Sequence, residues 1–483
     1  MKSGFRRLRG MVDLMPADTA AWQRLERAVR ETMRGYGYDE IRTPLLESTA
    51  LFARSIGEAT DIVEKEMYTF PDRKGESLSL RPENTAGCVR AAIENGLLQP
   101  GSSSRVWYLG PMFRYERPQL GRQRQFHQAG AEVYGLGGPL IEAELILLSK
   151  RLWEALEIYE DRRNGPADAG GDRVLTLEIN TLGTSEERTR YRERLVAYLQ
   201  DNRDALDEDS LRRLERNPLR VLDSKNPAMQ DVVAGAPALR DSLSDESRRH
   251  FDTLRELLVS RGLEPVENPR LVRGLDYYSH TVFEWTTDRL GAQSAVCAGG
   301  RYDGLLEQLG KADTPGVGWA MGLERVVALM AAVAADRGPT RPDVFVIATD
   351  DVRSSDSLAL AERLREALTS DGPDGGPLRM SGEVVHNVSG GSLKSQFRKA
   401  DRSGARVAAV IGAEELEAKA VTLKPLGGGE QRRVRCDLDD PDDGGELEQA
   451  LSEMLKAAGS EALVDVPGAA EGRASRRSRA NDA

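Results

Sequence analysis

The stretch FRYERPQLGRQRQFHQAGAEVYG, residues 113–135, decides how the rest of this chain is interpreted. Apolar and polar residues alternate on both sides of its loop, which predicts strands at 104–115 and 126–134. In and beside the loop lie four arginines and a single acid, namely Arg114, Arg117, Arg122, Arg124 and Glu116. Arginine suits bidentate contact with phosphate, and Phe126 could stack on a base. A solvated charged hairpin explains the same composition equally well.

Three later segments could contribute to a binding site. LVRGLDYYSHTVFEW at 271–285 carries two tyrosines, which offer a ring and a hydroxyl to a small polar ligand. Tyrosines that only pack within a strand are the simpler explanation. CAGGRYDGLLEQLG at 297–310 and GVGWAMGLERVV at 316–327 are glycine-rich, so a ligand could approach their backbone closely. Arg325 follows on a predicted helix and could face a phosphate, although the chain contains neither a dinucleotide-binding GxGxxG unit nor a P-loop.

Composition limits the class of protein. The 483 residues predict about three domains of roughly 150 residues each. With 67 basic and 78 acidic residues the net charge is −11, which argues against a surface that binds nucleic acid throughout but allows local basic grooves. The three cysteines are far apart and lack zinc-binding spacing, which predicts reduced thiols, no metal site and a cytoplasmic location. No apolar run is long enough to span a membrane, and no signal peptide is expected.

The pattern along the chain divides it into unequal parts. Residues 1–335 mix strands and helices, and the charge-dense stretch 184–262 within them predicts an inserted helical module. Strand–helix alternation at 342–436 predicts a small α/β domain with a mixed sheet. Residues 437–483 are expected to form an acidic segment and a disordered tail that act as a linker or aid solubility.

One predicted helix of the small domain carries a basic stripe. SGGSLKSQFRKADRSG at 389–404 spaces Lys394, Arg398 and Arg402 four residues apart, which places them on one helix face. Such a stripe can follow a phosphate backbone, although a solvated helix face is the more common reason for it.

Taken in order, these segments resemble the histidyl-tRNA synthetase family of class II aminoacyl-tRNA synthetases, in its bacterial form. The resemblance covers roughly residues 8–435. The segments that carry it are RGMVDLMP (9–16) at the N-terminus, GYGYDEIRTPLLE (35–47) as motif 1, residues 113–135 as motif 2, GVGWAMGLER (316–325) as motif 3, and the histidine-specific signatures LVRGLDYY (271–278) and AGGRYDGL (298–305). The class I signatures HIGH and KMSKS are absent.

The resemblance implies a fold and a reaction. The fold would be an α+β catalytic domain, an antiparallel sheet flanked by helices, with a helical insertion and a C-terminal α/β anticodon-binding domain. As a histidine–tRNA ligase, the enzyme would activate L-histidine with ATP to histidyl-adenylate and pyrophosphate. It would then transfer histidine to the 3′ end of tRNA(His) and release AMP. Also implied are Mg²⁺ held mainly through the ATP phosphates, a cytoplasmic homodimer whose interface includes Pro44, and no membrane partner.

The resemblance also assigns roles to residues by motif position. The catalytic residues would be Arg114 at the α-phosphate and Arg273, which would bridge that phosphate and the histidine carboxylate. ATP would be bound by Arg114, Glu116, Arg122, Phe126 and Arg325. The histidine pocket would consist of Glu83, Asn84, Thr85, Arg114, Gln128, Glu132, Arg273, Tyr277, Tyr278 and Tyr302. tRNA would be contacted by Arg117, Gln119, Lys394, Arg398 and Arg402.

Two departures and two alternatives remain. Asn84 stands where many bacterial members of the family have glycine, and Met11 replaces a common threonine. The first alternative is the non-catalytic regulatory subunit of ATP phosphoribosyltransferase, which shares the catalytic fold but typically lacks the anticodon-binding domain. The second is a histidine- or tRNA-binding module that has lost catalysis, which the presence of Arg114, Arg273 and Arg325 disfavours.

Overall fold

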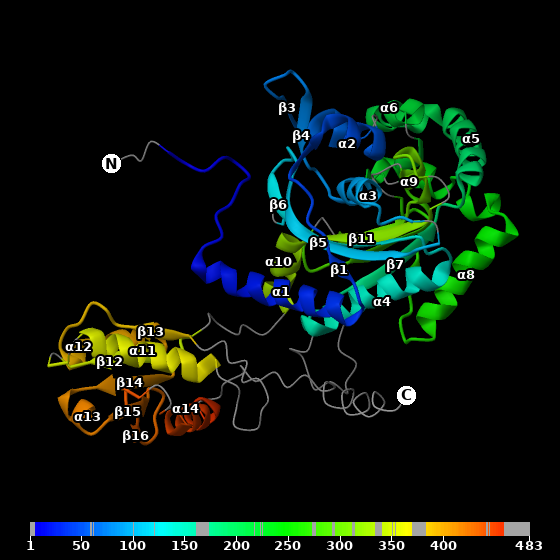
Figure 1. Ribbon diagram of the computed structural model, residues 1–483. Helices are drawn as coiled ribbons and strands as arrows, with labels where there is room; N and C mark the ends of the chain where they lie inside the picture. The colour runs from blue at the N-terminus through cyan, green and yellow to red at the C-terminus, as the bar shows by residue number, and fades with distance from the viewer. Residues whose placement is uncertain are drawn as a thin grey trace, which may run out of the picture. The chain divides into compact units, whose positions relative to one another are not determined.

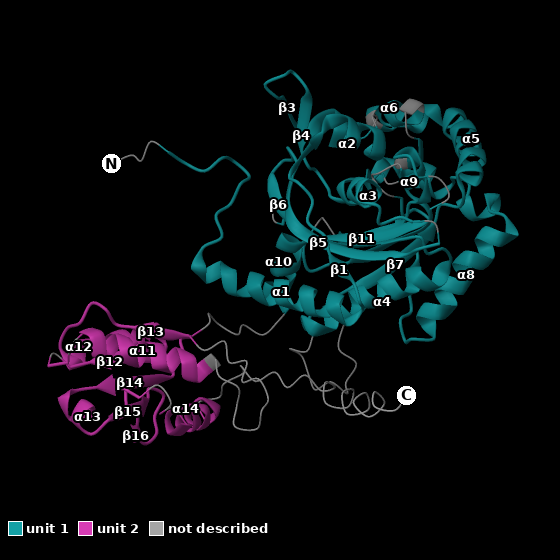
Figure 2. Ribbon diagram, viewed as in Figure 1, with its two compact units in different colours: residues 1–337 teal, residues 338–483 magenta. Residues whose placement is uncertain are grey.

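The chain forms two compact units, Met1–Arg337 and Gly338–Ala483, which are coloured separately in Figure 2. The structure is a computed structural model. It describes residues 5–457 except for 58, 59, 61, 100, 120, 161–172, 217, 223, 225, 273–276, 292–294, 312–313, 334–340, 350, 353, 370–382, 441, 442 and 444. None of the helices within this described part of the chain is long and apolar enough to cross a membrane.

An eight-stranded sheet forms the centre of the first unit (Figure 1). Its strands, in spatial order, are β1 (Asp39–Glu40), β5 (Ser104–Phe113), β6 (Gln125–Tyr134), β11 (Gly316–Gly322), β10 (Ala295–Arg301), β9 (Ser279–Thr286), β7 (Thr176–Thr181) and β8 (Val266–Glu267). Neighbouring strands are antiparallel except at the two edges, where β1 and β8 run parallel to their partners. The expected antiparallel sheet is therefore confirmed.

Helices cover both faces of this sheet, and Figure 1 shows α1 and α4 on one side and α3 and α9 on the other. The first face carries α1 (Pro16–Gly35), α4 (Pro139–Ala155), α8 (Asp245–Val259) and α10 (Leu323–Val333). The second face carries α3 (Thr85–Glu94) and α9 (Asp303–Gln308). Successive residues of β5 point into different cores, Val106 into the second and Trp107 into the first, as strand alternation requires.

The helix α1 shows how local sequence sets this packing. Trp22, Leu25, Val29 and Met33 recur at helical spacing and are all buried in the first core. Pro16 starts the helix, where a missing N–H costs nothing, and Asp18 accepts a hydrogen bond from the backbone N–H of Met15 at 3.1 Å.

A small lobe adjoins α3. It consists of α2 (Thr49–Ile56), a short π-helix at Ile62–Glu66 and a three-stranded antiparallel sheet in the order β2 (Leu46–Ser48), β4 (Ser77–Leu80) and β3 (Tyr68–Pro71). Residues 81–85 run directly from β4 into α3, and this short connection becomes the floor of the candidate site.

The charge-dense stretch 184–262 is helical. It contains α5 (Ser185–Asp201), α6 (Glu208–Arg216), α7 (Gln230–Ala234) and α8, joined by 3₁₀ turns at Arg203–Ala205, Pro218–Val221, Pro227–Met229 and Leu239–Ser242. A single carboxylate ties two of these helices together at their N-termini. Glu187 accepts hydrogen bonds from the backbone N–H groups of Thr184 and Ser244 and from the Ser247 hydroxyl, at 2.8, 2.7 and 2.8 Å. These bonds outweigh the effect of burial and lower the pKa of Glu187 to about 2.

The second unit is an α/β domain with the mixed sheet that the sequence predicted. Its strand order is β13 (Val384–His386), β12 (Val344–Ala348), β14 (Val407–Ile411), β15 (Ala420–Pro425) and β16 (Arg432–Arg435). The first three are parallel and the last two antiparallel. The accompanying helices are α11 (Ser354–Thr369), α12 (Leu393–Ser403), α13 (Ala413–Glu417) and α14 (Gly445–Ala457).

The helix α14 corrects the expectation for residues 437–483. Part of what we assigned to an acidic segment and tail is a helix whose Leu447, Leu451 and Leu455 are buried in the core of the second unit. The acidic run ahead of it concealed the apolar residues at four-residue spacing. Residues 458–483, the rest of the expected tail, lie outside the described part of the chain.

Candidate active site

A buried carboxylate on β6 lies at the centre of the candidate site. Glu132 is 1% exposed, and its carboxylate accepts hydrogen bonds from the hydroxyls of Thr85, at 2.7 Å, and of Tyr302. Burial raises the pKa of Glu132 to about 8, and the two hydrogen bonds oppose that rise only in part. Gly318 on the neighbouring strand β11 makes room for this group, because a Cβ there would lie 1.8 Å from Glu132 Oε2.

Three tyrosines form a wall beside this carboxylate. The ring centroids of Tyr277 and Tyr278 lie 4.7 Å apart, and those of Tyr277 and Tyr302 lie 5.8 Å apart. All three side chains are buried, and burial raises the pKa of Tyr277 and Tyr302 well above the ordinary value, so their hydroxyls stay protonated. Arg188 of α5 donates a hydrogen bond to the backbone carbonyl of Tyr278, so the helical insertion supports this wall.

Residues 83 and 84 have different surroundings although they are adjacent. The Glu83 carboxylate accepts from the backbone N–H groups of Thr85 and Ala86 at 2.6 and 3.0 Å and so caps α3. Asn84 instead accepts from the Thr43 hydroxyl at 2.6 Å and donates to Cys88 Sγ at 3.3 Å. We expected Asn84 to line the histidine pocket, but its amide is engaged with the motif 1 segment because Glu83 already occupies the helix cap.

Gln128 supplies an unsatisfied polar atom at the end of the pocket strand. In the sheet it lies between Gly110 of β5 and Gly322 of β11. Its Oε1 is buried and has no hydrogen-bond partner among the described residues. A buried acceptor of this kind is costly unless a ligand or water completes it, so Gln128 is suited to receive a donor from a substrate.

The motif 2 hairpin lies against the motif 3 arginine. Arg114 donates from Nε to the Pro82 carbonyl at 2.8 Å, and its guanidinium lies 5.4 Å from the centre of the Phe126 ring. At the tip, Gly121 has a φ of +69°, and a Cβ there would lie 2.9 Å from Cγ of Arg325. The expected phosphate-binding residues of the two motifs are thus brought together.

These residues create a positively charged recess. Arg122 donates to Glu116 at 3.0 Å, while Arg325 is only 9% exposed. Burial, and then the nearby charge of Arg122, lower the pKa of Arg325. Like charges held close together favour a polyanion such as a triphosphate, whose binding relieves their repulsion.

The N-terminal signature supports the same hairpin. The Gly10 carbonyl accepts from the backbone N–H of Arg124 at 2.7 Å, and the Arg124 guanidinium lies 3.6 Å from the centre of the Tyr115 ring. Sequence reasoning gave Arg124 no role and overlooked Arg81, which is buried in the floor of the site. The position of Arg81, directly before the pocket residues 82–85, was the available signal.

The remaining predicted residues fall elsewhere. Arg117 and Gln119 are exposed on the motif 2 loop, where Gln119 and Arg122 exchange backbone hydrogen bonds of 3.1 and 2.9 Å. Arg273, the second predicted catalytic residue, lies outside the described residues. Lys394, Arg398 and Arg402 are exposed along α12 of the second unit.

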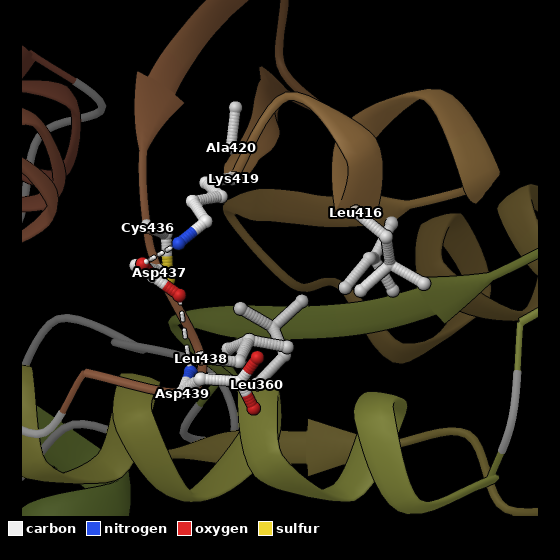
Figure 3. Close-up of a pocket in the computed structure, with 9 residues that line it drawn as sticks. Leu360, Leu416, Lys419, Ala420, Cys436, Asp437, Leu438 and Asp439 are labelled. Atoms are coloured by element: carbon white, nitrogen blue, oxygen red, sulfur yellow. Dashed lines mark hydrogen bonds and ion pairs between the residues drawn. The ribbon is translucent and has the colours of Figure 1, made fainter.

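A small cavity of about 70 Å³ occurs in the second unit (Figure 3). Its polar groups are already paired, since Lys419 forms an ion pair with Asp437, and Leu360, Leu416 and Leu438 supply its apolar lining. It contains none of the residues predicted to bind substrate or tRNA, so the candidate active site remains the one in the first unit.

Comparison with known proteins agrees with this geometry. A family model described as histidyl-tRNA synthetase matches residues 10–326, and one described as anticodon binding domain matches residues 343–439. The structure of apo S. aureus histidyl-tRNA synthetase is similar, with 30% identity, a TM-score of 0.71, and coverage of 93% of this chain and 99% of that one. Histidyl-tRNA synthetase from Nostoc sp. PCC 7120 shares the fold at 19% identity, with a TM-score of 0.64 and coverage of 94% and 100%.

A relative of the alternative class also shares the fold. An ATP phosphoribosyltransferase regulatory subunit/histidyl-tRNA synthetase from Bacillus halodurans matches at 20% identity with a TM-score of 0.56, covering 85% of this chain and 99% of that one. The match to an anticodon-binding domain and the higher identity to a synthetase both favour the first interpretation. The chain therefore belongs to the histidyl-tRNA synthetase family and is a ligase that joins histidine to tRNA.

Proposed function

We propose that histidine binds between the tyrosine wall and the strip 82–85, with its α-amino group at Gln128 and Glu132. The unsatisfied Oε1 of Gln128 is the observation that carries this placement, because an ammonium group supplies the donor it lacks. Glu132 can add a charge-assisted hydrogen bond once it is ionised. Tyr277, Tyr278 and Tyr302 supply the walls and hydroxyls that would surround the imidazole, with Glu83 and Thr85 at the floor.

ATP would bind across the motif 2 hairpin. Phe126 would stack on adenine and Glu116 would meet the adenine side, while Arg122 and Arg325 would hold the outer phosphates. Arg114 would contact the α-phosphate, since it emerges from β5 directly beside the pocket floor. Magnesium would arrive with ATP, and single carboxylates among several arginines suit an ion held mainly by phosphates and water.

The reaction then follows from charge. The histidine carboxylate attacks the α-phosphorus, a bond to phosphorus forms, and pyrophosphate leaves. No general base is required because the attacking carboxylate is already ionised. Arg114 and Arg273 would stabilise the charge that develops on the α-phosphate. In the second step a hydroxyl of the terminal ribose of tRNA attacks the histidyl carbonyl, and AMP leaves.

We also propose the partners that complete this activity. Arg117 and Gln119 on the exposed motif 2 loop would contact the acceptor end of tRNA(His), and the basic face of α12 would contact the anticodon region. The segment around Pro44 would form a homodimer interface, because Leu45 and Leu46 beside it are each 41% exposed. A cytoplasmic location fits tRNA charging and the three cysteines, which are all buried and unbonded to one another.

The decisive experiment is ATP–pyrophosphate exchange with a panel of amino acids. Exchange should depend on histidine, and equal exchange with proline or threonine would disprove the assigned specificity. Arg273→Ala should lower the exchange rate far more than it weakens ATP binding, because its proposed contacts form in the transition state. A variant with near-normal kcat would remove Arg273 from this role.

A further inference from the structure

The strip 81–85 connects the motif 1 segment to both halves of the active site. Four of its five residues make the contacts involved, and Thr43 lies at the other end of two of them. We infer that the hydroxyl of Thr43, acting through Arg81 and Asn84, positions this strip and thereby sets the geometry of the α-phosphate arginine and of the histidine pocket. Thr43 is thus a positioning residue for amino-acid activation, although it belongs to the segment outside the pocket.

The contacts form a closed triangle of side chains. The Thr43 hydroxyl donates to Asn84 Oδ1 at 2.6 Å. Arg81 Nη1 lies 2.9 Å from the same hydroxyl and 3.1 Å from the same Asn84 oxygen. It also lies 3.2 Å from the Thr43 carbonyl. Each of the three side chains touches the other two, so removal of one hydroxyl leaves two polar groups without a partner.

Burial makes this triangle costly to disturb. Arg81 is 5% exposed, and every acceptor recorded for its guanidinium is neutral, namely the Thr43 carbonyl and hydroxyl, the Asn84 amide and the Pro111 carbonyl. A buried cation without a neutralising carboxylate depends on all of its hydrogen bonds. Gly110 leaves room for it, because a Cβ there would lie 2.5 Å from Arg81 Nη2.

Asn84 is available for this contact because it does not cap α3. It occupies the N-cap position, but its side chain makes no capping hydrogen bond. Glu83 performs that task with both carboxylate oxygens. The amide of Asn84 therefore serves the connection to Thr43, and loss of that amide should leave the helix start intact.

The other side of the strip reaches the reacting groups. The Pro82 carbonyl accepts from Arg114 Nε at 2.8 Å, and Arg81 Nε donates to the Pro111 carbonyl at 2.9 Å. At the far end, the Thr85 hydroxyl donates to Glu132 at 2.7 Å. A small displacement of the strip would therefore move the α-phosphate contact and the pocket carboxylate together. Misplacement of this kind lowers kcat more than it weakens binding.

The test compares Thr43→Val, which removes the hydroxyl but keeps the side-chain shape, with Thr43→Ser, which keeps the hydroxyl. We expect Thr43→Val to lower kcat for histidine-dependent pyrophosphate exchange about tenfold, with KM for ATP changed by less than about threefold. Thr43→Ser should retain kcat within about threefold. Asn84→Gly should reduce kcat similarly alone, yet add little in the Thr43→Val background, because both remove the same connection.

Thr49→Val is the matched control. Its hydroxyl also bonds two side chains, Ser77 at 2.8 Å and Ser79 at 3.0 Å, but neither belongs to the strip. Denaturation midpoints of all variants show whether any loss of rate reflects unfolding. Should Thr43→Val unfold, Asn84→Gly carries the same test, because its φ of −121° is open to glycine. Normal kcat in both variants, or strictly additive effects in the double variant, would overturn the inference.

Discussion

The binding of histidine should depend on the ionisation of a single buried carboxyl group. Burial raises the pKa of Glu132 to about 8, so this acid is mostly neutral at pH 7 and mostly ionised at pH 9. Only the ionised form can pair with the ammonium group of the substrate. The sign follows directly, since KM for histidine should fall as the pH rises through 8. The perturbation that isolates this effect is Glu132→Gln, which cannot ionise.

The magnitude follows from the fraction ionised. With a pKa near 8, that fraction rises from about 10% at pH 7 to about 75% at pH 8.5, a factor of about eight. Glutamine resembles the neutral acid in shape, and the hydroxyls of Thr85 and Tyr302 can reorient around its amide. The ratio of KM for Glu132→Gln to KM for the unaltered enzyme should therefore grow about eightfold between pH 7 and 8.5.

The assay is pyrophosphate exchange at saturating ATP, with histidine varied at several pH values. Ionisation of histidine itself affects both proteins equally and cancels in the ratio. Arg114→Lys serves as a control, because it weakens the site without changing the ionisable group of the pocket. A ratio that stays flat from pH 6.5 to 8.5 would refute the reasoning, since it would mean that Glu132 does not change charge when histidine binds.

Two further predictions concern stability and tRNA. A pKa lowered from 4.5 to about 2 means that Glu187 contributes about 3 kcal/mol above pH 4.5, a contribution that is lost as the pH falls toward 2. Glu187→Gln should therefore lower the free energy of unfolding at pH 7 by about 2–3 kcal/mol in urea denaturation, and an unchanged midpoint would contradict this. Lys394→Ala combined with Arg398→Ala should raise KM for tRNA and reduce the salt dependence of charging by about 0.7–0.9 logarithmic units per lost phosphate contact. Pyrophosphate exchange should stay unchanged in that variant, and its loss would indicate misfolding.

Much of the architecture follows from local sequence. The apolar spacing of α1, the alternation of β5 and β6, and the strand–helix order of the second unit were all predictable, because each depends on residues close together in the chain. The helix α14 escaped because its buried face follows a run of acids that dominates the composition. The order of the motifs was enough to indicate the family.

The sequence by itself thus determined the elements, their order and the residue types available to the site. Only the tertiary structure decided which of those residues meet. It turned Asn84 toward Thr43 and away from the pocket, raised the pKa of Glu132 by burial, and brought Gly121 against Arg325. The physical reason is distance along the chain. Periodicity reports neighbours within a few residues, whereas these contacts join segments up to two hundred residues apart, and their energetics depend on what packing excludes from water.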